Sequence, residues 1–239
     1  MATPHSVPRA ARIGPWLALC AALVLGAVAI HGLTYGLTAW TLDQRREVRI
    51  ADHALRLPAI DVRNQHGQLQ RLFGAGPHMT PGAAPDAAPV GAAPKLYIVD
   101  FIYTRCPTVC RALGAEFAQL ARRIDADPMD SRIGLVSLSF DPRDTVRDLL
   151  GYANTYGARA PVWQVAAAVS PDAMSSLLHQ ADVIAIPDGM GGFEHNGGLH
   201  VVDGQGSVLA VYALDDFEQA YAFALAHLAH LAHARGSRP

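Results

Sequence analysis

The chain has 239 residues, of which 51% are hydrophobic and 17% are charged. Its formal net charge at pH 7 is -2. This balance gives no basis for binding nucleic acid, because nucleic-acid-binding domains carry an excess of Lys and Arg on one face. The three cysteines, Cys20, Cys106 and Cys110, are too few for a scaffold built from disulfides, so a hydrophobic core must stabilise the fold.

The first predicted element is an apolar run at residues 13–42 that contains no formally charged residue. A membrane-spanning helix needs about 20 apolar residues, and Trp16, Tyr35 and Trp40 lie towards the ends of the run, where interfacial aromatics are found. We therefore predict a transmembrane anchor at residues 13–42, preceded by a cytoplasmic tail at residues 1–12. A cleaved signal peptide is the alternative, but the run is long for one and shows no small-residue cleavage site.

Three segments are predicted between the anchor and the central strand. Residues 43–56 are mixed and polar, which favours a short stalk. Residues 57–72 are typical of a β-hairpin that turns at residues 64–67. Residues 74–94 are rich in Gly, Ala and Pro and show no hydrophobic periodicity, so we predict a flexible surface loop.

The two cysteines that could react or bind a metal lie in the stretch from Lys95 to Cys110. Leu96–Tyr103 is a short β-branched and aromatic run, which predicts a buried strand. Cys106 and Cys110 follow, with Pro107 between them in a place that fits the first turn of a helix. Both thiols are then predicted on one face of that first turn, where the helix dipole favours thiolates. Two such sulfurs could bridge each other or share a metal.

Strands and helices alternate through the rest of the chain, and no internal repeat is present. The predicted elements are a helix to about Ile124, a strand at 133–140, a helix that opens at 141–145, a strand at 161–165, a helix capped by Ser170, a hairpin at 200–212, a helix at 215–234 and a tail at 235–239. This order predicts an α/β sandwich domain at residues 57–234.

Several other polar residues are interpreted as structural. Asp141 and Asp144 favour a helix start, with Asp141 as the N-cap, and docking of a partner at Asp144 is the minor alternative. His227, His230 and His233 recur every third residue. Because this spacing drifts around a helix, a solvated face is favoured over a metal-capturing tail.

Four segments together resemble the Sco/SenC family of copper-handling, thioredoxin-like proteins. Thr104–Cys110 after a strand is similar to the family's cysteine turn, and 141–145 is similar to its Asp-Pro-x-x-Asp-Thr segment. Residues 193–206 resemble its histidine, strand and glycine turn, and the N-terminal hairpin also fits. The resemblance covers roughly residues 50–225. The chain departs from the family in its Ala/Pro-rich loop and in Arg111, where the family often has Pro.

The resemblance implies a thioredoxin-like fold, with a mixed central sheet flanked by helices and an N-terminal hairpin, behind one transmembrane helix. It also implies that Cys106, Cys110 and His195 are metal ligands for copper, either Cu(I) or Cu(II), which suit a soft, low-coordinate site. His200 falls where the family commonly has an aromatic strand residue. Zinc would prefer a fourth ligand, and Met190 is expected to be an exposed loop residue.

The function implied is that of a membrane-anchored copper metallochaperone that supplies the CuA site of cytochrome c oxidase. Its partners would be the copper-centre subunit of the oxidase and a periplasmic thiol reductant or an upstream copper donor. Arginines flank both ends of the apolar run, so charge alone does not orient it. The implied chemistry places the domain in the periplasm, on the bacterial inner membrane.

An enzyme is the alternative to a chaperone. A thiol–disulfide oxidoreductase that reduces cysteines of the oxidase subunit, or that acts in redox signalling, would need only Cys106 and Cys110. The three residues between the cysteines argue against an ordinary thioredoxin reductant. An inert structural disulfide is disfavoured because a bridge between helical positions i and i+4 is geometrically awkward.

Overall fold

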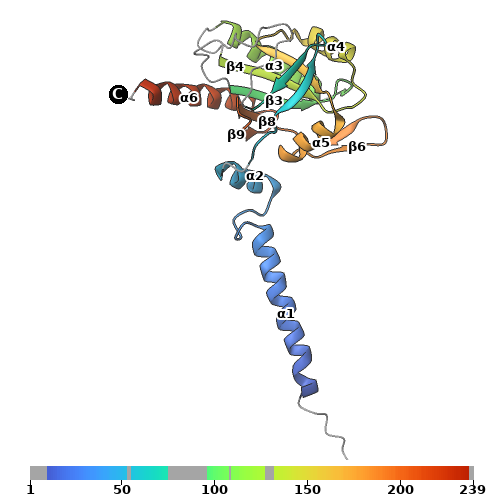
Figure 1. Ribbon diagram of the computed structural model, residues 1–239, viewed down its shortest axis with the longest axis vertical. Helices are drawn as coiled ribbons and strands as arrows, with labels where there is room; N and C mark the ends of the chain where they lie inside the picture. Colours follow the sequence, from blue (N-terminus) through green and yellow to red (C-terminus); the bar gives the residue numbers. More distant parts are fainter. Residues whose placement is uncertain (1–9, 53–54, 75–95, 108, 127–131, 237–239) are drawn as a thin grey trace, which may run out of the picture. The chain divides into compact units, whose positions relative to one another are not determined.

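The computed structural model describes residues 10–52, 55–74, 96–107, 109–126 and 132–236 (Figure 1). The chain forms two compact units, Met1–Asp52 and His53–Pro239. The helices and strands of the second unit are β1 (Ile60–Asn64), β2 (Leu69–Leu72), β3 (Leu96–Ile102), α3 (Val109–Ala126), β4 (Ile133–Ser139), α4 (Val146–Tyr156), β5 (Trp163–Ala168), α5 (Pro171–Gln180), β6 (Ala185–Pro187), β7 (Phe193–His195), β8 (Leu199–Asp203), β9 (Val208–Tyr212) and α6 (Phe217–Gly236).

The first unit contains two helices, α1 (Ala10–Leu33) and α2 (Leu42–Ala51). Within α1, Gly14–Leu33 is long and apolar enough to cross a membrane, as the sequence predicts. The helix does not fill the whole predicted run, because Tyr35, Gly36 and Leu37 take positive φ angles that end it. The segment predicted as a stalk is largely α2, since Thr41 starts a helix with a capping box.

A seven-stranded mixed sheet forms the centre of the second unit, in the order β2-β1-β5-β4-β3-β8-β9. The strands β3, β4 and β5 are parallel neighbours, and β8 pairs antiparallel with β3. The strand β1 joins the N-terminal hairpin to β5. All seven residues of β4 are buried, which is expected of a central strand covered on both faces.

Helices cover both faces of this sheet. The helix α3 contacts α4, and Arg123 of α3 pairs with Glu218 of α6, so these three helices share one face. The opposite face holds Phe101 and His200, whose ring centroids lie 5.3 Å apart. The Nε2 atom of His200 is 3.0 Å from the carbonyl oxygen of Ala181, the C-cap of α5, so α5 covers that second face.

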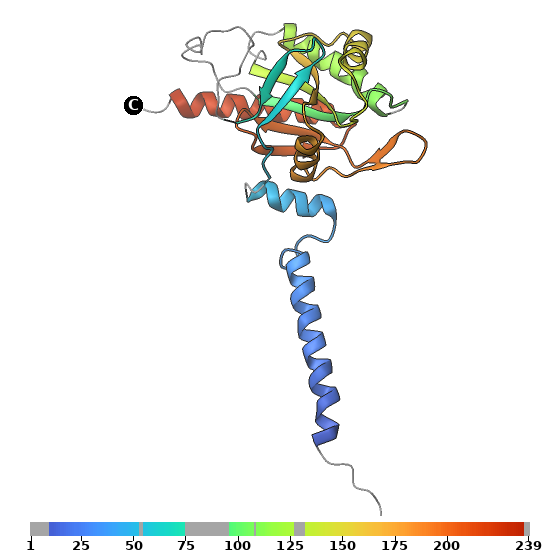
Figure 2. The ribbon, with the colours of Figure 1, turned by 45° about the vertical axis from the view of Figure 1, so that its right-hand side comes forward.

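The predicted fold class is confirmed in its mixed sheet, flanking helices and N-terminal hairpin. Ser170 caps α5 as predicted. The small β6–β7 hairpin was not predicted from the sequence; it projects from the sheet in Figures 1 and 2 and carries His195 on a strand. The predicted flexible loop at 74–94 lies outside the described residues except for Gly74.

Candidate metal centre

The two cysteines lie where β3 gives way to α3. The backbone N–H of Cys106 donates to the carbonyl of Tyr103 at 3.1 Å, which forms a turn, and the N–H of Cys110 donates to the sulfur of Cys106 at 3.4 Å. Both cysteines are buried thiols, with 7% of Cys106 and 1% of Cys110 exposed. The structure therefore brings the two sulfurs together in one turn.

The predicted placement of both thiols on a helix is wrong for Cys106. The helix α3 begins at Val109, so Cys106 and Pro107 precede it and only Cys110 is helical. The reason is local: a proline ring disfavours helical dihedral angles in the residue before it, which here is Cys106.

The predicted acidification of the thiols is also wrong for Cys110. Burial raises the pKa of its thiol well above the usual range, and the adjacent Cys106 and the buried Asp100 add to the rise. The backbone of Tyr103 opposes the shift only in part. In this buried position desolvation outweighs the helix dipole, so Cys110 is a neutral thiol at pH 7.

Asp100 lies on β3 and is completely buried. Within the described part of the chain, neither of its carboxylate oxygens forms a hydrogen bond of good geometry, although the Ser137 hydroxyl lies near them. Burial raises the pKa of Asp100 to about 7, and the Ser137 hydroxyl on the neighbouring strand offsets part of the shift. A second buried titratable group therefore lies close enough to influence Cys110.

His195 ends β7, opposite Ala185 of β6. Its ring packs edge-to-face on Phe140, with centroids 5.1 Å apart. Its Nδ1 atom is buried and has no hydrogen-bond partner among the described residues. Burial lowers the pKa of His195, so its imidazole is neutral at pH 7. A Cβ atom at Gly197 would lie 2.8 Å from the ring, so glycine there makes room for it.

Aromatic rings connect the cysteine turn to the β6–β7 hairpin. Tyr103 packs against Phe193 with centroids 5.4 Å apart, and its hydroxyl donates to the Phe193 carbonyl at 3.4 Å. Phe140 contacts both rings, at 5.8 Å from Tyr103 and 5.2 Å from Phe193. His195 and the cysteine turn therefore contact one aromatic cluster, formed by Tyr103, Phe140 and Phe193.

A buried carboxylate also connects these two segments. Asp141 accepts hydrogen bonds from Arg105 of the cysteine turn at 2.9 Å and from Nε of Arg143 at 2.8 Å. Arg143 in turn donates to the Gly191 carbonyl at 2.7 Å and lies over the ring of Phe193. Burial opposes ionisation of Asp141, but the hydrogen bonds from Arg143 and Arg105 outweigh it and lower the pKa of that carboxyl.

The predicted capping role of Asp141 is therefore wrong. Thr145 is the N-cap of α4 and forms a capping box with Asp148. The side chain of Asp144 is fully enclosed and accepts hydrogen bonds from Thr104 and Ser139, so it offers no surface for docking. Asp141 and Asp144 both stabilise the cysteine turn, because they accept hydrogen bonds from Arg105 and Thr104.

The family follows from comparison with known sequences. The model of the SCO1/SenC family matches residues 90–230. The chain belongs to the SCO1/SenC family. The match includes both cysteines, His195 and the Asp141 segment.

Individual SCO1/SenC relatives agree with this assignment. The SCO1 protein homolog of Bacillus subtilis (strain 168) is 26% identical over 121 residues, an alignment that covers 49% of this chain and 62% of the relative. A SCO1/SenC family lipoprotein of Bacillus anthracis str. Ames has a TM-score of 0.56 at 20% identity, covering 74% of this chain and 95% of that one.

The structure of Bradyrhizobium japonicum ScoI with copper bound gives a TM-score of 0.52 at 20% identity, covering 71% of this chain and 97% of that chain. At these identities the likeness establishes the fold, which is the thioredoxin-like fold that the sequence predicts for this SCO1/SenC chain.

The structure gathers only part of the predicted ligand set. Among the described residues, no group of three or more His, Cys, Asp or Glu side chains is close enough to hold a metal ion. The two thiols are adjacent, while His195 is connected to the cysteine turn indirectly, through the aromatic cluster. Copper ligation by these three residues therefore stays a prediction. Met190 is 90% exposed, as expected, and His230 and His233 of α6 are exposed.

Several residues that stabilise the site were not predicted from the sequence. Asp100 was signalled by an acid inside an otherwise apolar strand run. Arg143 and Phe140 gave no local signal, because their roles depend on contacts with a hairpin about fifty residues further along the chain, and such long-range contacts cannot be derived from periodicity.

Proposed function

We propose that this chain is a membrane-anchored copper metallochaperone that binds copper through Cys106, Cys110 and His195 and delivers it to the CuA site of cytochrome c oxidase. The observation that carries the proposal is a pair of adjacent thiols in a chain of the SCO1/SenC family. The copper-bound ScoI of Bradyrhizobium japonicum, which shares the fold, supports it.

The chemistry of the three side chains suits copper. Two thiolates and a neutral imidazole are soft and borderline donors that favour Cu(I) and can accept Cu(II). The buried Nδ1 of His195 has no partner among the described residues, and in the tautomer protonated at Nε2 its lone pair is available to a metal ion. Because Cys110 is a neutral thiol, copper binding must release its proton.

Delivery proceeds by ligand exchange. Each bond from copper to Cys106 or Cys110 breaks as copper bonds to a thiolate of the acceptor, and the proton lost by the acceptor's thiol passes to the freed cysteine. The bond to His195 breaks as a further donor atom of the acceptor replaces the imidazole, which leaves as a neutral group. The oxidation state of copper does not change. Both cysteines must be reduced beforehand, so a periplasmic thiol reductant and an upstream copper donor are proposed partners.

We place the domain at residues 57–234 in the periplasm and the anchor at residues 13–42 in the bacterial inner membrane. Residues 1–12 form a cytoplasmic tail, and residues 43–56 form a stalk between the anchor and the domain. Residues 235–239 are a short tail after the domain. The support is the apolar segment Gly14–Leu33 of α1, the one candidate span among the described residues, together with an acceptor centre that belongs to a membrane oxidase.

The test measures copper in the full-length chain in detergent. The wild type is expected to bind about one copper per chain, with a sulfur-to-copper charge-transfer band when loaded with Cu(II). His195→Ala is expected to lose most of the copper while its circular dichroism is unchanged. His230→Ala, an exposed histidine on α6, is the matched control and should retain it. Full copper affinity in His195→Ala would refute the ligand assignment.

A thiol–disulfide oxidoreductase is the second candidate. It is favoured by one observation: the two thiols are already adjacent, whereas His195 is not gathered with them among the described residues. This function predicts turnover with a disulfide substrate that needs both cysteines and is unaffected by His195→Ala. The same variants therefore separate the two functions.

A further inference from the structure

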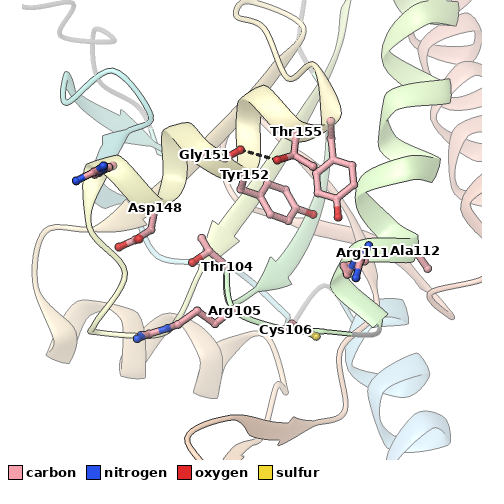
Figure 3. Close-up of a pocket in the computed structure, with 11 residues that line it drawn as sticks. Thr104, Arg105, Cys106, Arg111, Ala112, Asp148, Gly151, Tyr152 and Thr155 are labelled. Carbon is pink, nitrogen blue, oxygen red and sulfur yellow. Dashed lines mark hydrogen bonds between the residues drawn. The ribbon is translucent and has the colours of Figure 1, made fainter.

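An open groove lies beside the cysteine turn, between the start of α3 and the helix α4 (Figure 3). Its volume is about 780 Å³. The residues used below all line it and are Arg105, Cys106, Arg111, Arg147, Tyr152 and Tyr156. Figure 3 shows Arg105 coming from the loop after β3 and Arg111 from α3, with the sulfur of Cys106 between them in that view.

The lining of the groove is cationic. Three arginines line it, against one carboxylate, Asp148. The carboxylate of Asp148 is already engaged, because it accepts hydrogen bonds from the N–H and hydroxyl of Thr145 at 2.8 and 2.6 Å. None of the ion pairs among the described residues involves Arg111 or Arg147. Two exposed guanidinium groups therefore remain for an anionic partner.

One residue of the proposed centre lines this groove. Cys106 is that residue, whereas Cys110 is 1% exposed and is not among the lining residues. A ligand seated in the groove would thus meet Cys106 before Cys110.

The remaining wall of the groove is formed by two tyrosines whose contacts hold them in place. Tyr152 and Tyr156 pack with ring centroids 4.7 Å apart, and the Tyr152 hydroxyl donates to the Cys110 carbonyl at 2.9 Å. A Cβ atom at Gly114 would lie 2.7 Å from the Tyr156 ring, so glycine lets α3 approach this wall closely. Rigid tyrosines beside arginines are the composition of protein-binding surfaces.

We propose that this groove docks an extended acidic segment of the protein that accepts copper, and that the docked segment presents the acceptor's thiols to Cys106. The proposal rests on the proposed function. Charge complementarity selects the occupant: the lining offers unpaired guanidinium groups for carboxylates, which Arg binds in a bidentate manner. A planar lipid surface cannot follow a groove between two helices, so a polypeptide segment fits better.

The binding experiment uses the full-length copper-free chain in detergent. The probe is a fluorescent twelve-residue peptide with four Asp or Glu and with Ser in place of Cys, so that no mixed disulfide forms. A peptide with the matching Asn and Gln is the neutral probe. We expect the acidic probe to bind about tenfold more tightly than the neutral one, and we expect added salt to remove the difference.

The charge-reversed variant Arg111→Glu/Arg147→Glu is expected to lose this preference. Its matched control is Arg122→Glu/Arg159→Glu, which makes the same change at exposed sites outside the groove. Arg122 lies on the same helix as Arg111, about 16 Å along it at 1.5 Å per residue. The control is expected to bind the acidic probe as the wild type does. Equal loss in both double variants, or no preference in the wild type, would overturn the proposal.

A transfer experiment then separates this proposal from the proposed function. Copper-loaded chain is mixed with the Cys-containing acidic peptide and with its neutral counterpart. Arg111→Glu/Arg147→Glu is expected to keep its copper but to transfer it about tenfold more slowly to the acidic acceptor only. Unchanged transfer by this variant would contradict docking in the groove and leave the proposed chaperone function unaffected. Absence of copper from the wild type would instead contradict the chaperone function, while the copper-free binding experiment still decides the groove.

Discussion

Burial sets the protonation state of three ionisable side chains around the cysteine turn. Asp100 and Cys110 hold their protons to higher pH than usual, and His195 gives its proton up at lower pH. The cause is the same in each case, because removal from water penalises the charged form. At neutral pH the thiol of Cys110 and the imidazole of His195 are therefore uncharged. A bound copper ion would be needed to favour the thiolate.

The substitution Asp100→Asn tests this account. The pKa of Asp100 rises from 3.8 when unfolded to about 7 when folded, so the folded state binds more protons between these values. The contribution of Asp100 to wild-type stability should therefore fall as the pH rises from about 4 to 7 and then level off, a loss on the order of 2–4 kcal/mol. Asp100→Asn removes that slope. The free energy of unfolding of the copper-free chain, measured in urea at pH 5 and pH 8, checks it.

The exposed Asp125→Asn, on α3, is the control and should keep the wild-type slope. A slope that survives in Asp100→Asn would show that another group carries the pH dependence.

The β6–β7 hairpin is the element that carries His195, one of the proposed copper ligands. It is short, and among the described strands β6 and β7 pair only with each other. Its attachment to the rest of the domain includes the aromatic cluster and Arg143, which bonds the Gly191 carbonyl and lies over Phe193. Since Asp141 binds both Arg143 and Arg105, a single carboxylate joins the hairpin to the cysteine turn.

Arg143→Gln is expected to loosen the hairpin. The variant loses the charge-assisted bonds to Asp141 and the contact with Phe193. Amide hydrogen exchange at residues 185–195 should accelerate about tenfold, because local opening of the hairpin becomes easier. Arg147→Gln, whose side chain lines the groove, is the control and should leave this exchange unchanged. Unaltered exchange in Arg143→Gln would show that the aromatic contacts alone hold the hairpin.

Comparison with the sequence shows which elements periodicity can predict. The strand β3 and the helices α3 and α5 have clear apolar patterns or caps, and they were predicted near their observed bounds. The start of α4 was misplaced, because Asp141 and Thr145 are both good caps and the choice is made by Arg105 and Arg143, which bind Asp141. The β6–β7 hairpin was missed because its strands of three residues are too short to show alternation.

At the scale of the whole molecule, the proposed function would link metal binding to the fold. The second unit, His53–Pro239, carries every proposed ligand. Its thiols are adjacent before copper binds, but His195 is not gathered with them among the described residues. Copper should therefore act as a crosslink between β3, α3 and the hairpin, which makes the loaded chain more stable than the copper-free chain.

Copper loading is expected to raise the unfolding temperature of the full-length chain. A ligand at 100 times its dissociation constant adds about 2.7 kcal/mol, which corresponds to about 5–10 °C for a domain of this size. His195→Ala should show a smaller rise, because it loses the bond that fastens the hairpin, and Cys106→Ser/Cys110→Ser should show none. Calorimetry with and without a copper chelator measures the shift, and the chelator should reverse it. A full rise in His195→Ala would mean that copper is held by the cysteine turn alone, and that the hairpin contributes nothing to the loaded state.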